Sequence, residues 1–213
     1  MTNTPDDSRY VFIVDDDANI RASLSRALNL RGYEVQAFES ASAFLDAYDG
    51  TASGCVLLDY GMPGMNGLEL QERLTDQGYK IPIIFITGHG GIPESVQAMK
   101  MGALDFLEKP FKQSVLIDRI EAAFETDQER RLDSRQHSQV RKRFDALTER
   151  EREIAMILCT DTGHNSSKQI ARQLGISPRT VDHHRARILE KMNVGSVAEL
   201  VETSMRAGLF EDI

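Results

Sequence analysis

The sequence predicts an α/β fold, a doubly wound five-stranded parallel sheet, joined to a small all-α helix-turn-helix domain. Short apolar runs alternate five times with amphipathic stretches over the first 125 residues. Three of these runs are apolar without alternation, which is typical of strands buried on both faces of a parallel sheet. The remainder of the chain shows helical patterns bounded by capping and turn residues.

The expected strands are, in chain order, residues 10–14, 33–38, 55–58, 82–86 and 103–107. Apolar residues at helical spacing follow each of them, as at Ile20, Leu24 and Leu28 after the first. A strand followed by a helix, repeated five times, favours parallel pairing with helices on both faces of the sheet.

Residues 126–143 carry many charges and only two large apolar residues, Leu132 and Val140. We interpret this segment as a charged linker, and a continuation of the fifth helix would also fit it. It lacks the apolar repeat that a coiled coil requires. The expected organisation is therefore an α/β domain over 1–125, a linker over 126–143 and a helical domain over 144–213.

The helical domain shows clear start and stop signals. Thr148 with Glu151, and Ser166 with Gln169, have the spacing of capping boxes at helix starts. Between two later helices, Gly175 is placed to end one, while Ser177 and Pro178 are placed to begin the next. Two short helices around such a turn favour a helix-turn-helix, and a generic helical bundle is the alternative.

Composition limits the classes of protein. A chain of 213 residues with 41% hydrophobic and 27% charged residues has room for one or two folded domains and is not disordered. No apolar run approaches the roughly 18 residues of a membrane span, and the polar N-terminus lacks a secretory signal. We expect a cytoplasmic protein without a membrane partner. Cys55 and Cys159 lack the spacing of a zinc module or a disulfide framework.

The net charge of the chain also differs between its first and second domains. Residues 1–127 have a net charge of −10, and residues 128–213 have a net charge of +2. Six basic residues lie between Lys168 and Lys191, against two acidic ones. An acidic first half and a locally basic second half indicate two domains with different partners.

Polar residues stand after four of the expected strands, at the ends where ligands of such sheets bind. Asp15, Asp16 and Asp17 follow the first strand, Asp59 the third, Thr87 the fourth and Lys109 the fifth. Ligands of open parallel sheets bind beyond the carboxyl ends of the strands. Each residue alone is more often a cap or a turn residue. Together, clustered carboxylates with a hydroxyl and an ammonium indicate Mg²⁺-dependent phosphoryl chemistry with an aspartyl phosphate.

These motifs resemble the receiver domain of two-component response regulators, over about residues 9–127. The matching positions are the acidic pair Asp15-Asp16, the phospho-accepting Asp59, the switch hydroxyl Thr87, the switch aromatic Phe106, and Lys109 before a usually cis Pro110. The resemblance implies a flavodoxin-like fold. It also implies that Asp16, Asp59 and the carbonyl of Gly61 bind Mg²⁺ directly, and Asp15 through water. Asp17 is expected to begin a helix.

Residues 144–210 resemble the helix-turn-helix output domain of the FixJ/NarL/LuxR type, and the pairing with this receiver is closest to the FixJ subgroup. The motifs are 147–152, 168–171, 174–181 and 191–192, and the segment 158–168 is a few residues longer than usual. The second helix of such a motif enters the major groove. The expected DNA contacts are Lys168, Arg179, Thr180, Asp182, His183, Arg185 and Arg187.

The predicted function is a DNA-binding transcription regulator, controlled by phosphorylation of Asp59 from a partner sensor histidine kinase, and not an enzyme. Expected partners are promoter DNA, a second copy of the phosphorylated chain and RNA polymerase. Pairing would use the surface around Val96, Lys100 and Ala103, together with the last helix around Leu200. Three alternatives are a Mg²⁺-dependent phosphotransferase, a regulator driven by a small ligand, and an RNA-binding protein.

Overall fold

A computed structural model describes residues 9–88, 92–160 and 166–210. The chain divides into two compact units between Arg131 and Leu132. In the first unit, strands and helices alternate in the order β1 (Arg9–Val14), α1 (Ala18–Asn29), β2 (Glu34–Phe38), α2 (Ala41–Ala47), β3 (Ser53–Asp59), α3 (Gly67–Asp76), β4 (Ile83–Thr87), α4 (Ile92–Lys100), β5 (Asp105–Glu108) and the first part of α5 (Gln113–Asp145).

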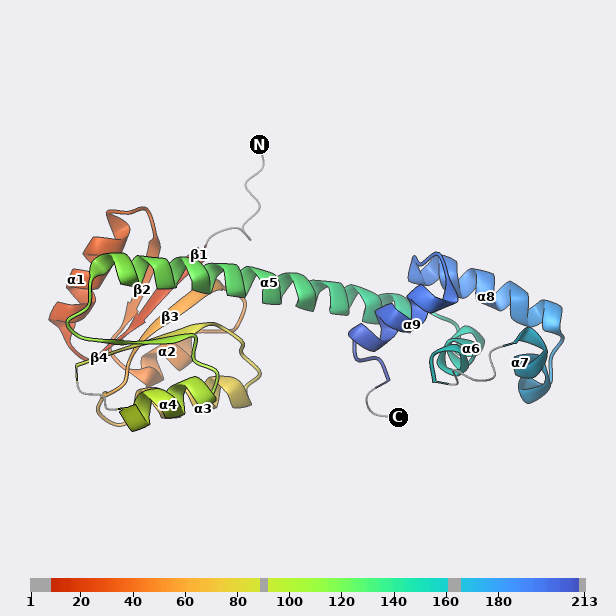
Figure 1. The fold of residues 1–213 in the computed structure, drawn as a ribbon, viewed down its shortest axis with the longest axis horizontal. Coiled ribbons are helices and arrows are strands. Elements are labelled where there is room, and N and C mark those ends of the chain that lie inside the picture. Colours follow the sequence, from red (N-terminus) through yellow and green to blue (C-terminus); the bar gives the residue numbers. More distant parts are fainter. Residues whose placement is uncertain (1–8, 89–91, 161–165, 211–213) are drawn as a thin grey trace. The chain divides into compact units, whose positions relative to one another are not determined.

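The five strands form one parallel sheet in the order β2-β1-β3-β4-β5. Helices α1 and α5 pack against one face of the sheet, and α2, α3 and α4 pack against the other (Figure 1). The side chains of β1 alternate between these two cores, with Phe12 facing the α2–α4 side and Ile13 the α1 and α5 side. The predicted doubly wound, flavodoxin-like fold is confirmed.

Helix α5 runs without a break through the segment 126–143 that the sequence predicts as a linker. Asp127 on this helix is 3% exposed and accepts hydrogen bonds from Ser53 Oγ at 2.6 Å and from the Gly54 N–H at 3.0 Å. Arg131 pairs with the same carboxylate at 2.8 Å. These contacts bind the middle of α5 to the start of β3, whereas Val140 further along is buried in the core of the second unit.

The second unit is helical over its described residues, with the last part of α5 followed by α6 (Glu149–Thr160), α7 (Ser167–Leu174), α8 (Pro178–Met192) and α9 (Val197–Arg206). Both predicted capping boxes are present. Gly175 ends α7 with a φ of 66°, and Ser177 caps α8 with Pro178 in its first turn. None of the described helices combines the length and hydropathy needed to cross a bilayer.

Glu151 joins α6 to α8 from within this core. Its side chain is 2% exposed and accepts hydrogen bonds from Lys191 Nζ at 2.6 Å and from the Thr148 N–H at 2.9 Å. Burial alone would raise the pKa of this carboxyl, but the hydrogen bonds outweigh it and hold the pKa at about 2, against an ordinary 4.5. The unfolded chain therefore binds this proton more readily, so the stabilisation is present above pH 4.5 and is lost as the pH falls towards 2.

We expect Lys191→Met to destabilise the second unit by about 2 to 3 kcal/mol at pH 7, because it leaves a buried carboxylate without its cation. Native-state hydrogen exchange of the α6 amides in the full chain measures this loss. Arg206→Met is the matched control, since Arg206 and Glu202 form an ion pair with side chains 70% and 68% exposed. Its loss should change stability by less than about 1 kcal/mol. Equal losses in the two variants would contradict the assignment.

Candidate functional site

The polar residues predicted from the sequence meet at the carboxyl edge of the sheet. The strand ends are in register, with Leu58 beside Val14, Asp59 beside Ile86 and Thr87 beside Glu108. The neighbours of β1 are β2 and β3, so the strand order reverses there, and ligands of open α/β sheets bind at such a reversal. Asp15 and Asp59 lie at this position, directly after β1 and at the end of β3.

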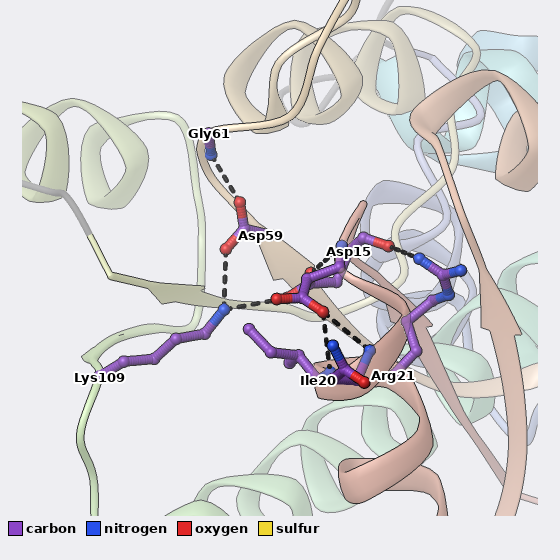
Figure 2. A network of polar contacts seen from close by, with 8 residues as sticks. Asp15, Ile20, Arg21, Asp59, Gly61 and Lys109 are labelled. Atoms are coloured by element: carbon purple, nitrogen blue, oxygen red, sulfur yellow. Dashed lines mark hydrogen bonds and ion pairs between the residues drawn. The ribbon is translucent and has the colours of Figure 1, made fainter.

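Lys109 connects the two carboxylates (Figure 2). Its Nζ lies 2.9 Å from Asp15 Oδ2 and 3.0 Å from Asp59 Oδ1. The side chains of Lys109, Asp15 and Asp59 are 21%, 5% and 12% exposed. Partial burial alone would lower the pKa of Lys109, but its hydrogen bonds to the two carboxylates outweigh burial and raise it. The lysine is therefore a fixed cation between two carboxylates that would otherwise repel each other.

Asp59 is accessible to a reactant but is held in place. Its second oxygen, Oδ2, accepts a hydrogen bond from the Gly61 N–H at 2.8 Å, so both oxygens have a donor (Figure 2). Gly67 lies close behind it, because a Cβ on Gly67 would stand 2.6 Å from the main-chain oxygen of Asp59. Such a carboxylate can attack an electrophilic phosphorus from a defined position.

The three consecutive aspartates have different surroundings. Asp15 is 3% exposed, and its Oδ1 accepts a hydrogen bond from the Asp17 N–H at 2.9 Å. Asp17 caps α1 by accepting from the Asn19 and Ile20 N–H groups, which confirms its expected place at a helix start. Asp16 is exposed, and its carboxylate makes no hydrogen bond or ion pair with any residue that the structure describes.

The oxygen atoms of the predicted metal ligands are chemically suited to a Mg²⁺ ion. Within the described ranges, no cluster of three His, Cys, Asp or Glu side chains is arranged to hold a metal ion. Mg²⁺ does not require one, since it is usually bound by one or two carboxylates and keeps several waters. The predicted ligands, which are the Asp16 and Asp59 carboxylates and the Gly61 carbonyl, are oxygen donors of the kind that Mg²⁺ prefers, and the Lys109 ammonium lies between Asp59 and Asp15.

Thr87 and Phe106 lie on the two strands next to this site. Thr87 ends β4 and is 2% exposed, and its carbonyl accepts from the Lys109 N–H at 2.7 Å. Phe106 in β5 is half-buried with its ring centroid 6.1 Å from that of Phe85. The Lys109–Pro110 peptide is cis, as the resemblance implies. Residues 89–91, between Thr87 and α4, lie outside the described part of the chain.

The expected DNA-contacting residues lie on α7 and α8. Val181, Ile188 and Met192 of α8 are buried in the core of the second unit. Five of the predicted contacts on α8 are exposed, namely Arg179, Thr180, Asp182, His183 and Arg187, and the sixth, Arg185, is half-buried. Lys168 in the first turn of α7 is also exposed. The longer segment before α7 includes residues 161–165, which lie outside the described part.

Two of these residues have partners within the unit that the sequence does not reveal. Ser167 Oγ donates a hydrogen bond to Asp182 Oδ1 and accepts one from Arg185 at 3.1 Å. Ser167 begins α7, so this network binds the start of α7 to the exposed side of α8. The capping box at Ser166 predicts that a helix begins at Ser167, but it does not identify Asp182 and Arg185, which lie 15 and 18 positions after Ser167, as partners of the Ser167 hydroxyl.

Comparisons with known proteins agree with both halves of this description. Residues 11–121 match the response regulator receiver domain, and residues 145–204 match the bacterial regulatory proteins of the luxR family. The transcriptional regulatory protein FixJ of Bradyrhizobium diazoefficiens is 41% identical over 203 residues, which cover 95% of this chain and 98% of that protein. The transcriptional regulatory protein TdiR of Thauera aromatica is 40% identical, covering 92% of this chain and 85% of TdiR.

Two solved structures resemble most of the chain. The response regulator StyR has a TM-score of 0.79 and 43% identity, covering 93% of this chain and 99% of that one. Full-length FixJ from B. japonicum has a TM-score of 0.57 and 40% identity, covering 95% and 98%.

Proposed function

Because this chain belongs to the two-component response regulators that join a receiver domain to a LuxR-type DNA-binding domain, we propose that Asp59 accepts the phosphoryl group that controls it. The chain is a transcription regulator of a two-component system. The observation that supports Asp59 most directly is its position at the end of β3, with one oxygen on Lys109 Nζ and the other on the Gly61 N–H.

The phosphoryl donor is the phosphohistidine of a sensor histidine kinase. A carboxylate oxygen of Asp59 attacks the phosphorus, the bond from phosphorus to the histidine nitrogen breaks, and an aspartyl phosphate forms. Lys109, already between Asp15 and Asp59, balances the charge of the new group, and Thr87 provides a hydroxyl from the neighbouring strand. This reaction regulates the chain's own output domain, so no small-molecule substrate is needed.

Receiver domains bind Mg²⁺ at the phosphorylation site. In this chain Asp16, Asp59 and the Gly61 carbonyl would hold the ion, and Asp15 would act through water. The bound cation would neutralise charge on the phosphoryl oxygens. Lys109 pairs with both Asp15 and Asp59, which limits the repulsion between the two carboxylates when the ion is absent.

Promoter DNA is the ligand of the second unit. We propose that Thr180 and His183, in the first half of α8, face the base edges, as the N-terminal half of a recognition helix does. Lys168, Arg179, Arg185 and Arg187 contact phosphates. Asp182 contributes both to base recognition and to holding Ser167.

Pairing of two phosphorylated copies is the proposed route from Asp59 to DNA, with RNA polymerase as a further candidate partner. Val96 and Met99 on α4 are each 46% exposed and give two receivers an apolar contact surface. Two residues expected at the paired surfaces are core residues instead: Ala103 is 5% exposed beneath the end of α4, and Leu200 of α9 is fully buried. On α9 the exposed apolar residue is Met205, at 57%.

Incubation of the full chain with a small acyl phosphate and Mg²⁺ tests the assignment of Asp59. We expect one acid-labile phosphate per chain, located at Asp59 by peptide mapping after reduction of the acyl phosphate. The Asp59→Asn variant, which keeps the shape of the side chain but not its nucleophilic carboxylate, should take up none. Labelling of that variant at the wild-type rate would show that another residue is the acceptor.

A further inference from the structure

The turn between β1 and α1 is held by a residue outside the acidic site, Arg21. This residue lies on the first helical turn of α1, and its Nη1 donates a hydrogen bond of 2.7 Å to the main-chain carbonyl of Asp15 (Figure 2). Its backbone N–H donates to the Asp17 carbonyl at 3.0 Å. In Figure 2 the guanidinium approaches Asp15 from the side opposite Lys109 and Asp59. Arg21 therefore contacts the backbone of the turn and does not touch the phosphoacceptor.

With this contact, the polar atoms of Asp15 all have partners. Its N–H donates to the Phe38 carbonyl at 3.2 Å, and its two carboxylate oxygens accept from Asp17 and Lys109, each at 2.9 Å. The carbonyl, held by Arg21, belongs to the same rigid plane as the N–H of Asp16. The direction in which the chain leaves Asp15 is thus fixed by hydrogen bonds to four different parts of the first unit.

The orientation of Asp16 depends on these hydrogen bonds of Asp15. Asp16 is exposed and its carboxylate has no hydrogen bond or ion pair to any described residue, so no side-chain contact within the described part of the chain orients it. Its position is set by the two segments next to it in the chain. Before Asp16, Arg21 holds the Asp15–Asp16 peptide plane, and after it Asp17 caps the start of α1.

We infer that Arg21 is a positioning residue for the Mg²⁺ site, which it serves by fixing the Asp15–Asp16 peptide so that the Asp16 carboxylate faces the ion. The inference rests on the proposed function of the acidic site. Groups that orient metal ligands without touching the metal commonly change metal affinity by about 10- to 100-fold when they are removed.

If Arg21 acted only through its charge, removing it would change the Mg²⁺ affinity in the opposite direction. A guanidinium beside a cation site repels Mg²⁺, so removing it would tighten binding if Arg21 acted only through its charge. A positioning role predicts that removing it weakens binding. The direction of the change in Mg²⁺ affinity therefore separates the two accounts.

Isothermal titration of the unphosphorylated full chain with MgCl₂ measures this affinity directly. Arg21→Met removes the donor and the charge and keeps most of the length, and we expect Mg²⁺ to bind it about tenfold more weakly. Arg21→Lys keeps the charge on a shorter side chain, and it should also bind more weakly than wild type. Arg26→Met is the matched control, because Arg26 is an exposed cation on the same helix and should leave the affinity unchanged.

The dependence of acyl phosphate labelling on Mg²⁺ gives a second measurement. For Arg21→Met the half-saturating Mg²⁺ concentration should rise about tenfold, while the rate at saturating Mg²⁺ stays near wild type, since Arg21 does not touch Asp59. If Arg21→Met and Arg21→Lys bind Mg²⁺ as tightly as wild type, or more tightly, the inference is wrong. If Arg21→Met does not fold, Arg21→Lys alone decides, because the charge account predicts wild-type affinity for it.

Asp16→Asn separates this inference from the proposed function. It should bind Mg²⁺ much more weakly than wild type if Asp16 is a ligand. Weak binding by Asp16→Asn with wild-type binding by both Arg21 variants would overturn only the role of Arg21. Wild-type binding by Asp16→Asn would overturn the proposed ligand set and the inference with it.

Discussion

DNA binding by this chain should weaken by at least two orders of magnitude when the salt concentration rises from about 50 to about 200 mM. Each phosphate neutralised by Lys or Arg contributes about 0.9 to the log–log slope, because condensed counterions are released. The four basic residues proposed to face DNA are Lys168, Arg179, Arg185 and Arg187. One copy then gives a slope of about 3.6, or about a 150-fold loss over this range, and a pair on two half-sites gives about twice that slope.

Single substitutions should divide these contacts into two classes. Arg187→Ala should weaken binding to all sequences alike and lower the slope by about 0.9 for each bound copy. His183→Ala should change which base is preferred at one position, by about 1–3 kcal/mol, with little change in slope. Arg206→Ala, on the exposed side of α9, is the matched control and should change neither. An affinity that does not depend on salt would contradict the DNA-binding assignment of α8.

Much of the fold follows from local patterns. The uninterrupted apolar runs of β3 and β4 require burial on both faces, so they predict a central place in a parallel sheet. The caps of α7 and α8 are short-range signals and were predicted with their residues. The acidic edge could also be predicted, because the carboxyl ends of parallel strands meet at one edge whatever the strand order.

Contacts between distant residues could not be predicted in this way. Asp127 accepts a hydrogen bond from Ser53, which lies 74 positions earlier, and the charged pattern around Asp127 indicated a linker or a continuation of the fifth helix but not this contact. The contact from Arg21 to the Asp15 carbonyl involves a backbone acceptor, which leaves no trace in residue types. Leu200 and Ala103 show the same limit for surfaces, since apolar spacing predicts that a face is covered but not whether the core or a partner covers it.

Phosphorylation of Asp59 should raise DNA affinity by about 100-fold, which corresponds to about 2.7 kcal/mol and lies within the usual range of allosteric coupling. Asp59 and the predicted DNA contacts lie in different units, so the effect requires a shift between two conformations. Asp59 shares Lys109 with Asp15, and a new phosphoryl group changes the charge that this lysine balances. Thr87, at the end of the next strand, is placed to respond.

The proposed response passes from Thr87 and Phe106 to α4. A displacement of buried Thr87 towards the phosphoryl group would leave space that the half-buried Phe106 ring can fill. The exposed Val96 and Met99 on α4 would then pair two receivers. Pairing joins two DNA-binding units and raises affinity through effective concentration, without new contacts to bases. Thr87→Ala should accept phosphate on Asp59 but show a much smaller gain in DNA affinity.

The most direct test of this account is the DNA affinity of the full chain at one fixed salt concentration, measured with and without acyl phosphate, with light scattering on the same samples. We expect wild type to gain about 100-fold and to change from monomer to dimer, while Asp59→Asn gains nothing and Thr87→Ala gains much less. A wild-type chain that carries phosphate on Asp59 yet stays monomeric, with unchanged DNA affinity, would contradict the account.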